Sequence, residues 1–399
     1  MLGLKKFSVI SLQLVLICAL GVQNEAFSTP AASRGAKKFL EKAKSPLSHH
    51  HEITTTLSSH VPTKIFSTQG GAAEPVADGA EGKMETKQKI KVGIYLALWY
   101  VISIGYNLDT KKIFNVMPLP WTLMSVQLLI GSIWVSSMWA LGIRKVPKLD
   151  AADLKALAPT AALNTLSLLT AAIGLGAGTV SFVHIVKSAE PLFTALFGAL
   201  LLGQFMAPAV YAALLPVVAG VALASAKELS FSWTAMGGAM GSNLTSALRA
   251  VLAKKQLGGG QLAGKNMGGA NLYAVLTVLG AGMLLPAALL VEGAAVGPAW
   301  RAALQAGHTA GGLLLPTLLS GLYLYWYYEV SFLALDAISP VTHAVANTMR
   351  RVFLVASAIF VFKTPVTPLN LVGSAMAIGG VFLYSMVKDF YDNKKKTGK

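Results

Sequence analysis

The stretch SPVTHAVANTMRRVFLV, residues 339–355, places two adjacent arginines, Arg350 and Arg351, in a segment apolar enough to lie within a membrane. The nearest charged residues along the chain are Asp336, 14 residues before Arg350, and Lys363, 12 residues after Arg351. In a helix each arginine would therefore lie roughly 18–20 Å from a flanking charge. A charged side chain at the bilayer centre costs at least about 2.5 kcal/mol. We therefore interpret the pair as part of an anion site.

The composition supports a membrane setting for this segment. Charged residues make up 13% of the 399-residue chain, hydrophobic residues 54%, and the mean hydropathy is +0.59. Soluble domains carry roughly 25% charged residues, so the balance predicts a polytopic membrane protein. The net charge of +16 lies in the first ninety residues, in short connections and in the C-terminal tail. Because no basic domain stands apart from the apolar segments, we expect no nucleic-acid partner. The single cysteine, Cys18, excludes an internal disulfide framework.

Apolar segments recur along the chain from residue 92 onward. Several exceed eighteen residues with few or no charges, the length that a membrane-spanning helix needs. The expected spans are 92–109, 117–141, 152–173, 177–201, 206–226, 231–254, 270–292, 310–333, 338–362 and 366–387. The prediction is an all-α polytopic membrane protein with ten transmembrane helices.

Two stretches of the chain share one pattern, which indicates an internal repeat. Residues 181–228 and residues 339–389 each begin with a serine shortly before a histidine, continue through a basic residue, and close on Gly-Val-x-Leu-x-Ser. The spacing from histidine to glycine is 36 residues from His184 and 37 from His343. A repeat of five helices, 92–228 followed by 229–388 with a basic tail at 389–399, reverses the orientation of the second copy. Such a 5+5 inverted repeat holds substrate near the membrane midplane.

The repeat adds a third cation to the arginine pair. Lys187, three residues after His184, occupies the first copy where Arg350 and Arg351 occupy the second, so we expect the three to converge. A phosphate group suits them, because the guanidinium fork matches its oxygens. The alternative is a structural ion pair between Lys187 and Glu190.

Tyrosines, an arginine and two histidines near these segments also need an interpretation. Tyr323 and Tyr327 share one helical face and form either an interfacial aromatic belt or a donor to the anion. Arg249 lies in the sixth span, either in the site or snorkelling to the basic end of its helix. The two histidines are interpreted as helix-packing donors, since no carboxylate or nucleophile accompanies them.

The motifs VSFVHIVKSAEPLF, ISPVTHAVANTMRRV and NLDTKKIFN resemble the plastid phosphate translocators of the drug/metabolite transporter superfamily, over about residues 92–388. The resemblance implies exchange of inorganic phosphate for phosphorylated C3 metabolites (triose phosphate, 3-phosphoglycerate or phosphoenolpyruvate), without a cofactor. It assigns phosphate or substrate binding to Lys187, Arg351, Tyr327 and, approximately, Thr170.

Two departures separate the chain from that family pattern. The usual Lys-Arg pair is Arg350–Arg351, and a histidine of triose-phosphate carriers is Ser167. The sequence therefore does not decide the organic part of the substrate, and phosphoenolpyruvate is one of the candidates. A nucleotide-sugar or other sugar-phosphate transporter on the same fold is the alternative. An enzyme is disfavoured because no metal cluster or nucleophile with a base is evident, and a membrane scaffold does not explain the cations.

The N-terminal region reads as targeting sequence followed by a linker. Residues 1–26 have the basic start, apolar core and small residues of a signal peptide; a first transmembrane helix is the alternative. Residues 27–65 are rich in Ser, Thr, Ala and Lys, as in a transit peptide, and residues 66–91 have the composition of a disordered linker. Together the two signals resemble the bipartite presequence of algae with complex plastids, which implies a plastid envelope membrane. His49–His51 are not expected to bind metal.

Overall fold

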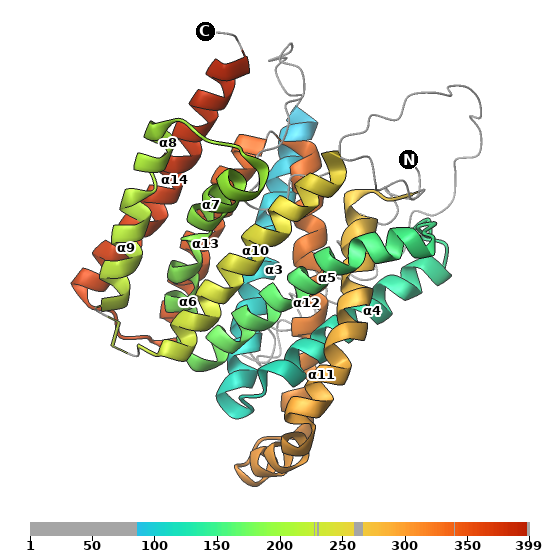
Figure 1. The fold of residues 1–399 in the computed structure, drawn as a ribbon. Coiled ribbons are helices and arrows are strands. Elements are labelled where there is room, and N and C mark those ends of the chain that lie inside the picture. Colours follow the sequence, from blue (N-terminus) through green and yellow to red (C-terminus); the bar gives the residue numbers. More distant parts are fainter. Residues whose placement is uncertain (1–85, 227, 230, 259–265, 339, 397–399) are drawn as a thin grey trace. The chain divides into compact units, whose positions relative to one another are not determined.

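The computed structural model describes residues 86–226, 228–229, 231–258, 266–338 and 340–396, and these residues are helical with short connections (Figure 1). The expected signal peptide, transit-like segment and most of the linker lie outside them. The helices are α3 Thr86–Val116, α4 Pro120–Ala140, α5 Ala151–Ala177, α6 Val180–Lys187, α7 Glu190–Leu202, α8 Pro208–Ala212, α9 Leu215–Ala226, α10 Trp233–Gly258, α11 Gly269–Gln305, α12 Ala310–Ala337, α13 Pro340–Phe362 and α14 Pro368–Lys396. α3 thus includes the last residues of the expected linker, and α14 runs into the expected tail.

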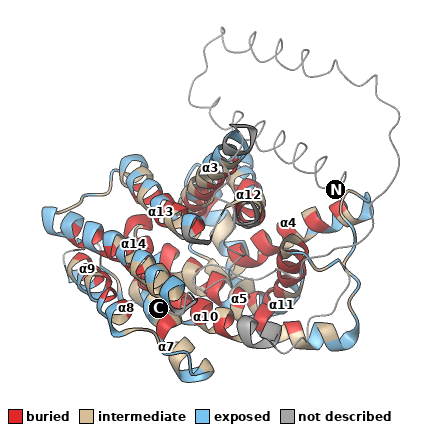
Figure 2. Cartoon of the chain, turned by 90° about the horizontal axis from the view of Figure 1, so that it is seen from above, coloured by how far each residue is buried: buried red, intermediate tan, exposed pale blue. Residues whose placement is uncertain are grey.

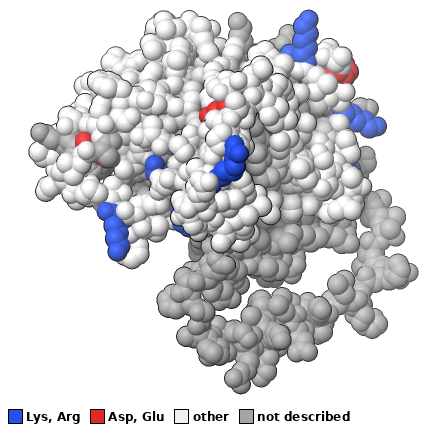
Figure 3. Space-filling view, turned by 90° about the horizontal axis from the view of Figure 1, so that it is seen from below, with Lys and Arg blue, Asp and Glu red and all other residues white. Residues whose placement is uncertain are grey.

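The membrane character of these helices is confirmed by their length and surface. Eight segments within the described residues are long and apolar enough to cross a membrane, namely Ile90–Val116, Pro120–Ala140, Ala151–Ala177, Val180–Leu202, Pro208–Ala226, Gly269–Gln305, Val345–Phe362 and Pro368–Lys394. Their outer faces carry large apolar side chains in the open, such as Leu290 at 88% exposed and Phe360 at 85%. Exposed residues follow the outer sides of the helices (Figure 2), and charged groups are sparse on the face shown in Figure 3. The all-α polytopic class predicted from composition is correct.

Residues 138–145 form a small unit of their own at the end of α4. Gly142 has a positive φ of 66°, which a glycine adopts without strain. The backbone N–H groups of Ile143 and Arg144 both donate to the Met138 carbonyl, at 3.1 and 3.2 Å, and so close the helix end. The remaining described residues, 86–137 and 146–396, belong to one compact unit.

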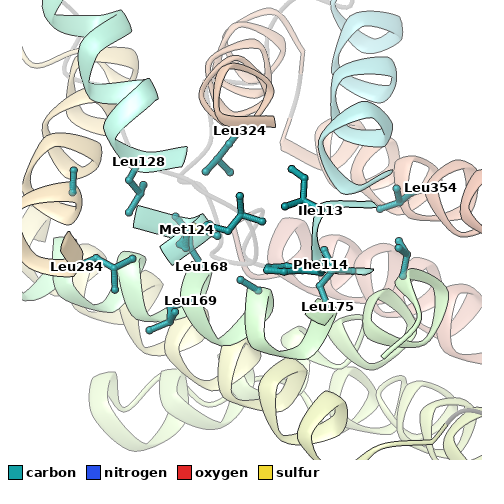
Figure 4. Packing of buried hydrophobic residues seen from close by; sticks show 14 of the residues in the cluster. Ile113, Phe114, Met124, Leu128, Leu168, Leu169, Leu175, Leu284, Leu324 and Leu354 are labelled. Atoms are coloured by element: carbon teal, nitrogen blue, oxygen red, sulfur yellow. The ribbon is translucent and has the colours of Figure 1, made fainter. Parts of the chain in front are cut away.

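Two apolar clusters fill that larger unit, and α6 and α13 contribute to both. One joins α3, α4, α5, α11 and α12 around Met124, Leu128 and Leu324, and includes Leu354 of α13 (Figure 4). The other joins α9, α10 and α14 to Phe182 of α6 and Val355 of α13. α6 and α13, one from each expected repeat, are therefore fixed on several sides, which holds their polar residues in defined positions.

The fourth expected span is broken in its middle, while its counterpart α13 is continuous. α6 ends at Lys187 and α7 begins at Glu190, with Pro191 in the first turn of α7. Because proline has no N–H, the helical ladder cannot pass through it. The chain tightens instead: Ser188 N–H donates to the Ile185 carbonyl at 3.0 Å, and Ala189 N–H to the Val186 carbonyl at 3.1 Å. Irregular backbone at this depth is tolerated where protein buries it.

Small residues let two helix pairs approach closely. A Cβ added at Gly373 of α14 would lie 2.5 Å from the Ala224 backbone nitrogen of α9, and one at Gly238 of α10 would lie 2.5 Å from Gly174 N of α5. Helices in membranes associate through such small-residue contacts. All four of these helices also pack against α6.

Gly373→Ala should destabilise the protein, because its methyl group has no room against the α9 backbone. Overpacking of this kind costs about 1–3 kcal/mol. Gly379→Ala is the matched control on the same helix, since a Cβ there meets nothing within 4 Å. Thermal unfolding of the purified protein in detergent should show a lower Tm for Gly373→Ala alone. Equal Tm values for the two variants would contradict the close α9–α14 contact.

Candidate functional site

The predicted cations lie on helices that pack around α6 and α13. α13 packs against α3 and α6, and α10 packs against α5 and α6. Lys187 is the last residue of α6, Arg350 and Arg351 lie midway along α13, and Arg249 lies on α10. The arginines are all buried, with 5–9% of each residue exposed. The charges of Arg249, Arg350, Arg351 and Glu190 all act on the Lys187 ammonium, which places them in one electrostatic cluster.

Arg351 forms an ion pair with Glu190, which the sequence interpretation considered as a partner of Lys187. Its Nη2 donates to Glu190 Oε2 at 3.2 Å, and the two side chains are 11% and 9% exposed. The alternative pairing of Glu190 with Lys187 is thus wrong for this structure. The reason is the break before α7, which separates Glu190 from Lys187 so that they do not share one regular helical turn. Arg351 Nη1 is buried and has no acceptor among the described residues.

Arg350 is enclosed by aromatic rings and neutral acceptors. Its Nη1 donates to Ser103 Oγ of α3 at 2.5 Å, and its Nε and Nη2 donate to Asn347 Oδ1 at 3.1 and 3.0 Å. The guanidinium carbon lies 5.5 Å from the Trp99 ring centroid and 5.1 Å from that of Tyr327. Such cation–π contacts are worth about 0.5–2 kcal/mol each. Arg350 therefore connects α13 to α3 and α12.

Lys187 ends in a group of serine hydroxyls. Its Nζ donates to Ser242 Oγ of α10. Ser167 Oγ of α5 lies 3.2 Å from Ser242 Oγ and 2.6 Å from Ser246 Oγ. Ser167, which the resemblance aligns with a histidine of triose-phosphate carriers, is therefore connected to Lys187 through one intervening hydroxyl. No carboxylate is paired with Lys187 among the described residues.

Arg249 lies one turn beyond Ser246 on α10 and is 7% exposed. Its Nε is buried and has no hydrogen-bond acceptor within the described part of the chain. Snorkelling to a helix end requires an exposed charged head, so that interpretation is wrong. Burial near Lys187 supports the assignment of Arg249 to the cluster.

Tyr327 and Thr170 differ in how closely the structure links them to the cations. Tyr327 is 7% exposed and contacts Arg350 with its ring, and Tyr323 is 6% exposed. Both are inside the protein, so the lipid-facing aromatic belt is excluded for them. Thr170 Oγ1 donates to the Leu166 and Ser167 carbonyls of its own helix, at 2.8 and 3.2 Å. Thr170 is thus beside Ser167, and its hydroxyl is not directed to a cation.

The two histidines hold helices together, as interpreted from the sequence. His184 Nε2 lies 2.8 Å from the Asn107 amide oxygen of α3. His343 Nε2 lies 3.3 Å from Ser331 Oγ of α12, and its ring stacks on Trp99 at 4.8 Å between centroids. These contacts anchor the last turn of α6 and the first turn of α13.

Four residues that contact the cations were not predicted as partners from the sequence, namely Trp99, Ser103, Asn347 and Ser242, and Glu190 was considered as a partner of Lys187 and not of Arg351. Asn347 and Arg350 are three apart on one helix, a spacing that predicts contact. Pro191 was a signal for the helix break. The other contacts join distant parts of the chain, and no local pattern reveals them.

Comparisons with known proteins identify the family of the chain. Residues 90–385 match the Triose-phosphate Transporter family. The chain is 34% identical to phosphoenolpyruvate/phosphate translocator 1, chloroplastic, of Arabidopsis thaliana, over 92% of this chain and 89% of that one. It is 35% identical to a triose phosphate/phosphate translocator of non-green plastids from Brassica oleracea var. botrytis, over 88% and 85%.

A third relative carries a larger sugar phosphate in its name. The xylulose 5-phosphate/phosphate translocator, chloroplastic, of Arabidopsis thaliana is 38% identical over 82% of this chain and 78% of its own. The identities of the three relatives are similar, so they group the chain with all of them and not with one substrate. The match to the family model and these relatives each extend over most of the chain, and the chain therefore belongs to the Triose-phosphate Transporter family.

Proposed function

We propose that this protein is an antiporter that exchanges inorganic phosphate for phosphorylated C3 metabolites across a plastid envelope membrane. The observation that carries the proposal is the buried cluster of Lys187, Arg249, Arg350 and Arg351. Among the contacts that the described residues show, Glu190 is the carboxylate paired with one of these four cations, Arg351, and counting these five groups gives a formal excess of three positive charges. A dianionic phosphate group lowers that excess to one. Relatives named for phosphate and triose phosphate, phosphoenolpyruvate or sugar phosphates support the same substrate class.

Within this proposal the site residues have separate tasks. Lys187 and Arg351 bind the phosphate group, since each keeps donors beyond the one contact that it makes. Arg249, whose Nε has no acceptor in the described structure, adds positive charge beside Lys187. Arg350 and Tyr327 form the wall on the α3 and α12 side. Thr170 lines the α5 side next to Ser167.

The organic half of the substrate is expected to contact the serine group. A hydroxyl at Ser167 offers one small donor or acceptor where an imidazole would fill more space. Triose phosphate, 3-phosphoglycerate and phosphoenolpyruvate are therefore all candidates. A competitor panel that includes glucose 6-phosphate and a nucleotide sugar, tested against labelled-phosphate uptake, identifies the preferred ester. Stronger competition by the nucleotide sugar would overturn the C3 assignment.

The proposal includes ten spans in a 5+5 inverted repeat. Besides the eight apolar segments described above, the proposal counts α10 and α12 as membrane spans. These helices are 26 and 28 residues long. α10 packs on α5 and α12 packs on α3, as spanning helices would. Their polar residues, including Arg249 and Glu329, lower the mean hydropathy but are buried inside the protein. The presequence points to a complex plastid.

Neutralising one phosphate-binding cation should abolish exchange without unfolding the protein. Removing charge from Lys187 or Arg351 takes away a direct donor to the dianion, and truncated ion contacts of this kind cost about 2–5 kcal/mol. Lys187→Ala and Arg351→Ala should therefore lose labelled-phosphate uptake into phosphate-loaded liposomes. Lys155→Ala, which changes an exposed lysine on α5, is the control and should transport normally. Normal uptake by either site variant would refute the site.

Transport should be strict counter-exchange, because the empty site keeps its positive excess. Desolvating uncompensated charge costs several kcal/mol, so the empty carrier resists closing and the loaded carrier does not. Labelled phosphate should enter liposomes that contain phosphate, with no proton or sodium requirement, and hardly enter empty ones. Equal uptake into loaded and empty vesicles would disprove this coupling.

Both ends of the mature chain should lie on one side of the membrane, because ten is an even number of spans. The basic connections at 144–148 and 254–265 and the tail should share that side, which we expect to be stromal. In a Cys18→Ala background, Gly142→Cys and Lys394→Cys should react with an impermeant thiol reagent from the same side. Labelling from opposite sides is incompatible with ten spans.

A further inference from the structure

Glu190 is a buried carboxylate that links the two halves of the repeat at their crossing. It is the first residue of α7, and its Oε2 accepts from Arg351 of α13, 161 positions away in the chain. The side chains of both residues are about nine-tenths buried. Burying an ion pair costs a large desolvation free energy, which is recovered only when the hydrogen-bond geometry is good. The hydrogen bonds between Glu190 and Arg351 therefore indicate whether the pair stabilises the fold.

The geometry is that of an incomplete pair. A guanidinium and a carboxylate that stabilise a fold commonly form two parallel hydrogen bonds. Here one bond of 3.2 Å joins them, and Arg351 Nη1 is left without an acceptor among the described residues. The pair therefore leaves Arg351 with donor capacity for another anion.

The surrounding charge also shows that Glu190 cannot neutralise the cluster. The charges of Arg249, Arg350 and Arg351 act together on Lys187, and Glu190 opposes them alone. Its position at the N-terminus of α7 favours a negative charge there, and α7 has no side-chain cap of its own. Glu190 is thus held as an anion beside cations that retain a positive excess.

We propose that Glu190 is an internal anion that competes with the phosphate group of the substrate for Arg351. This inference rests on the antiport function proposed above. In the empty carrier the carboxylate occupies one N–H donor at the edge of the guanidinium. A phosphate group offers more oxygens and more charge to the same fork, so it displaces the carboxylate from Arg351. The two anions then repel each other, which weakens substrate binding and speeds release.

Glu190→Gln tests the competition because glutamine keeps the size and one acceptor oxygen but loses the charge. Without the competing anion, the KM for phosphate in exchange should fall on the order of tenfold, the weight of a charged hydrogen bond. The maximal exchange rate should fall as well, since bound phosphate leaves more slowly. Uptake into empty liposomes should decrease further, because the empty site then carries more uncompensated charge.

Glu292→Gln is the matched control. Like Glu190, Glu292 of α11 accepts a hydrogen bond, in this case from the Thr122 backbone N–H at 2.8 Å. Glu292 and Thr122 do not belong to the cation cluster. This variant should keep the KM and the rate of the wild type. An unchanged or higher KM in Glu190→Gln, with a normal control, means that Glu190 only positions Arg351 and overturns the proposal.

Phosphate binding to the wild type supplies a readout that does not depend on a variant folding. Infrared difference spectra recorded with and without phosphate should contain a carboxylate stretching band, because Glu190 loses its guanidinium donor. The band should persist in Glu292→Gln. Its absence in a wild type that transports phosphate also overturns the proposal. A wild type that neither binds nor exchanges phosphate refutes the antiport function instead.

Discussion

Buried positive charge in apolar surroundings is the constraint on which this structure depends. The cations of the cluster have different partners. Arg350 contacts neutral acceptors and aromatic rings, Lys187 donates a hydrogen bond to a serine, and Arg351 forms an ion pair with Glu190. Arg249 keeps a buried Nε without an acceptor in the described residues. Neutral partners satisfy hydrogen bonds but leave the charge in place. The cluster is therefore stable enough to fold and still favours an incoming anion.

The break between α6 and α7 gives α6 and α13 different roles in this cluster. Pro191 ends the helical ladder, so Lys187 terminates α6 and Glu190 begins α7. No proline lies between Arg351 and the end of α13 at Phe362, and α13 is continuous through both arginines. The broken helix thus supplies the carboxylate and the lysine from two independent ends. The continuous one supplies two guanidinium groups that point to different neighbours, α3 for Arg350 and α7 for Arg351.

The sequence predicted the helical membrane class and the central cations, because both follow from local patterns. The length of an apolar segment indicates a membrane span, and Arg350 and Arg351 stand out because the nearest other charged residue along the chain, Lys363, is 12 residues away. The pairing of Glu190 was missed because it joins residues 161 positions apart and depends on a helix break. Trp99 and Ser103 were missed for a similar reason. Ser103 and Asn107 are four apart on α3 and mark a polar face that is buried, but their spacing does not reveal that this face meets α13 and α6.

The arginine at position 350, where related carriers are expected to have lysine, is explained by the shape of its surroundings. A guanidinium carries several N–H donors on one planar group, so Arg350 donates to Ser103 and Asn347 while its charge lies 5.5 Å from the Trp99 ring centroid and 5.1 Å from that of Tyr327. An ammonium group has three donors and no flat face, and it would leave one or more of these contacts unmade. Because Trp99 also stacks on His343 near the start of α13, the position of Arg350 is coupled to the docking of α13 on α3. Any displacement of α13 relative to α3 would then change the environment of this charge, because the same contacts hold both.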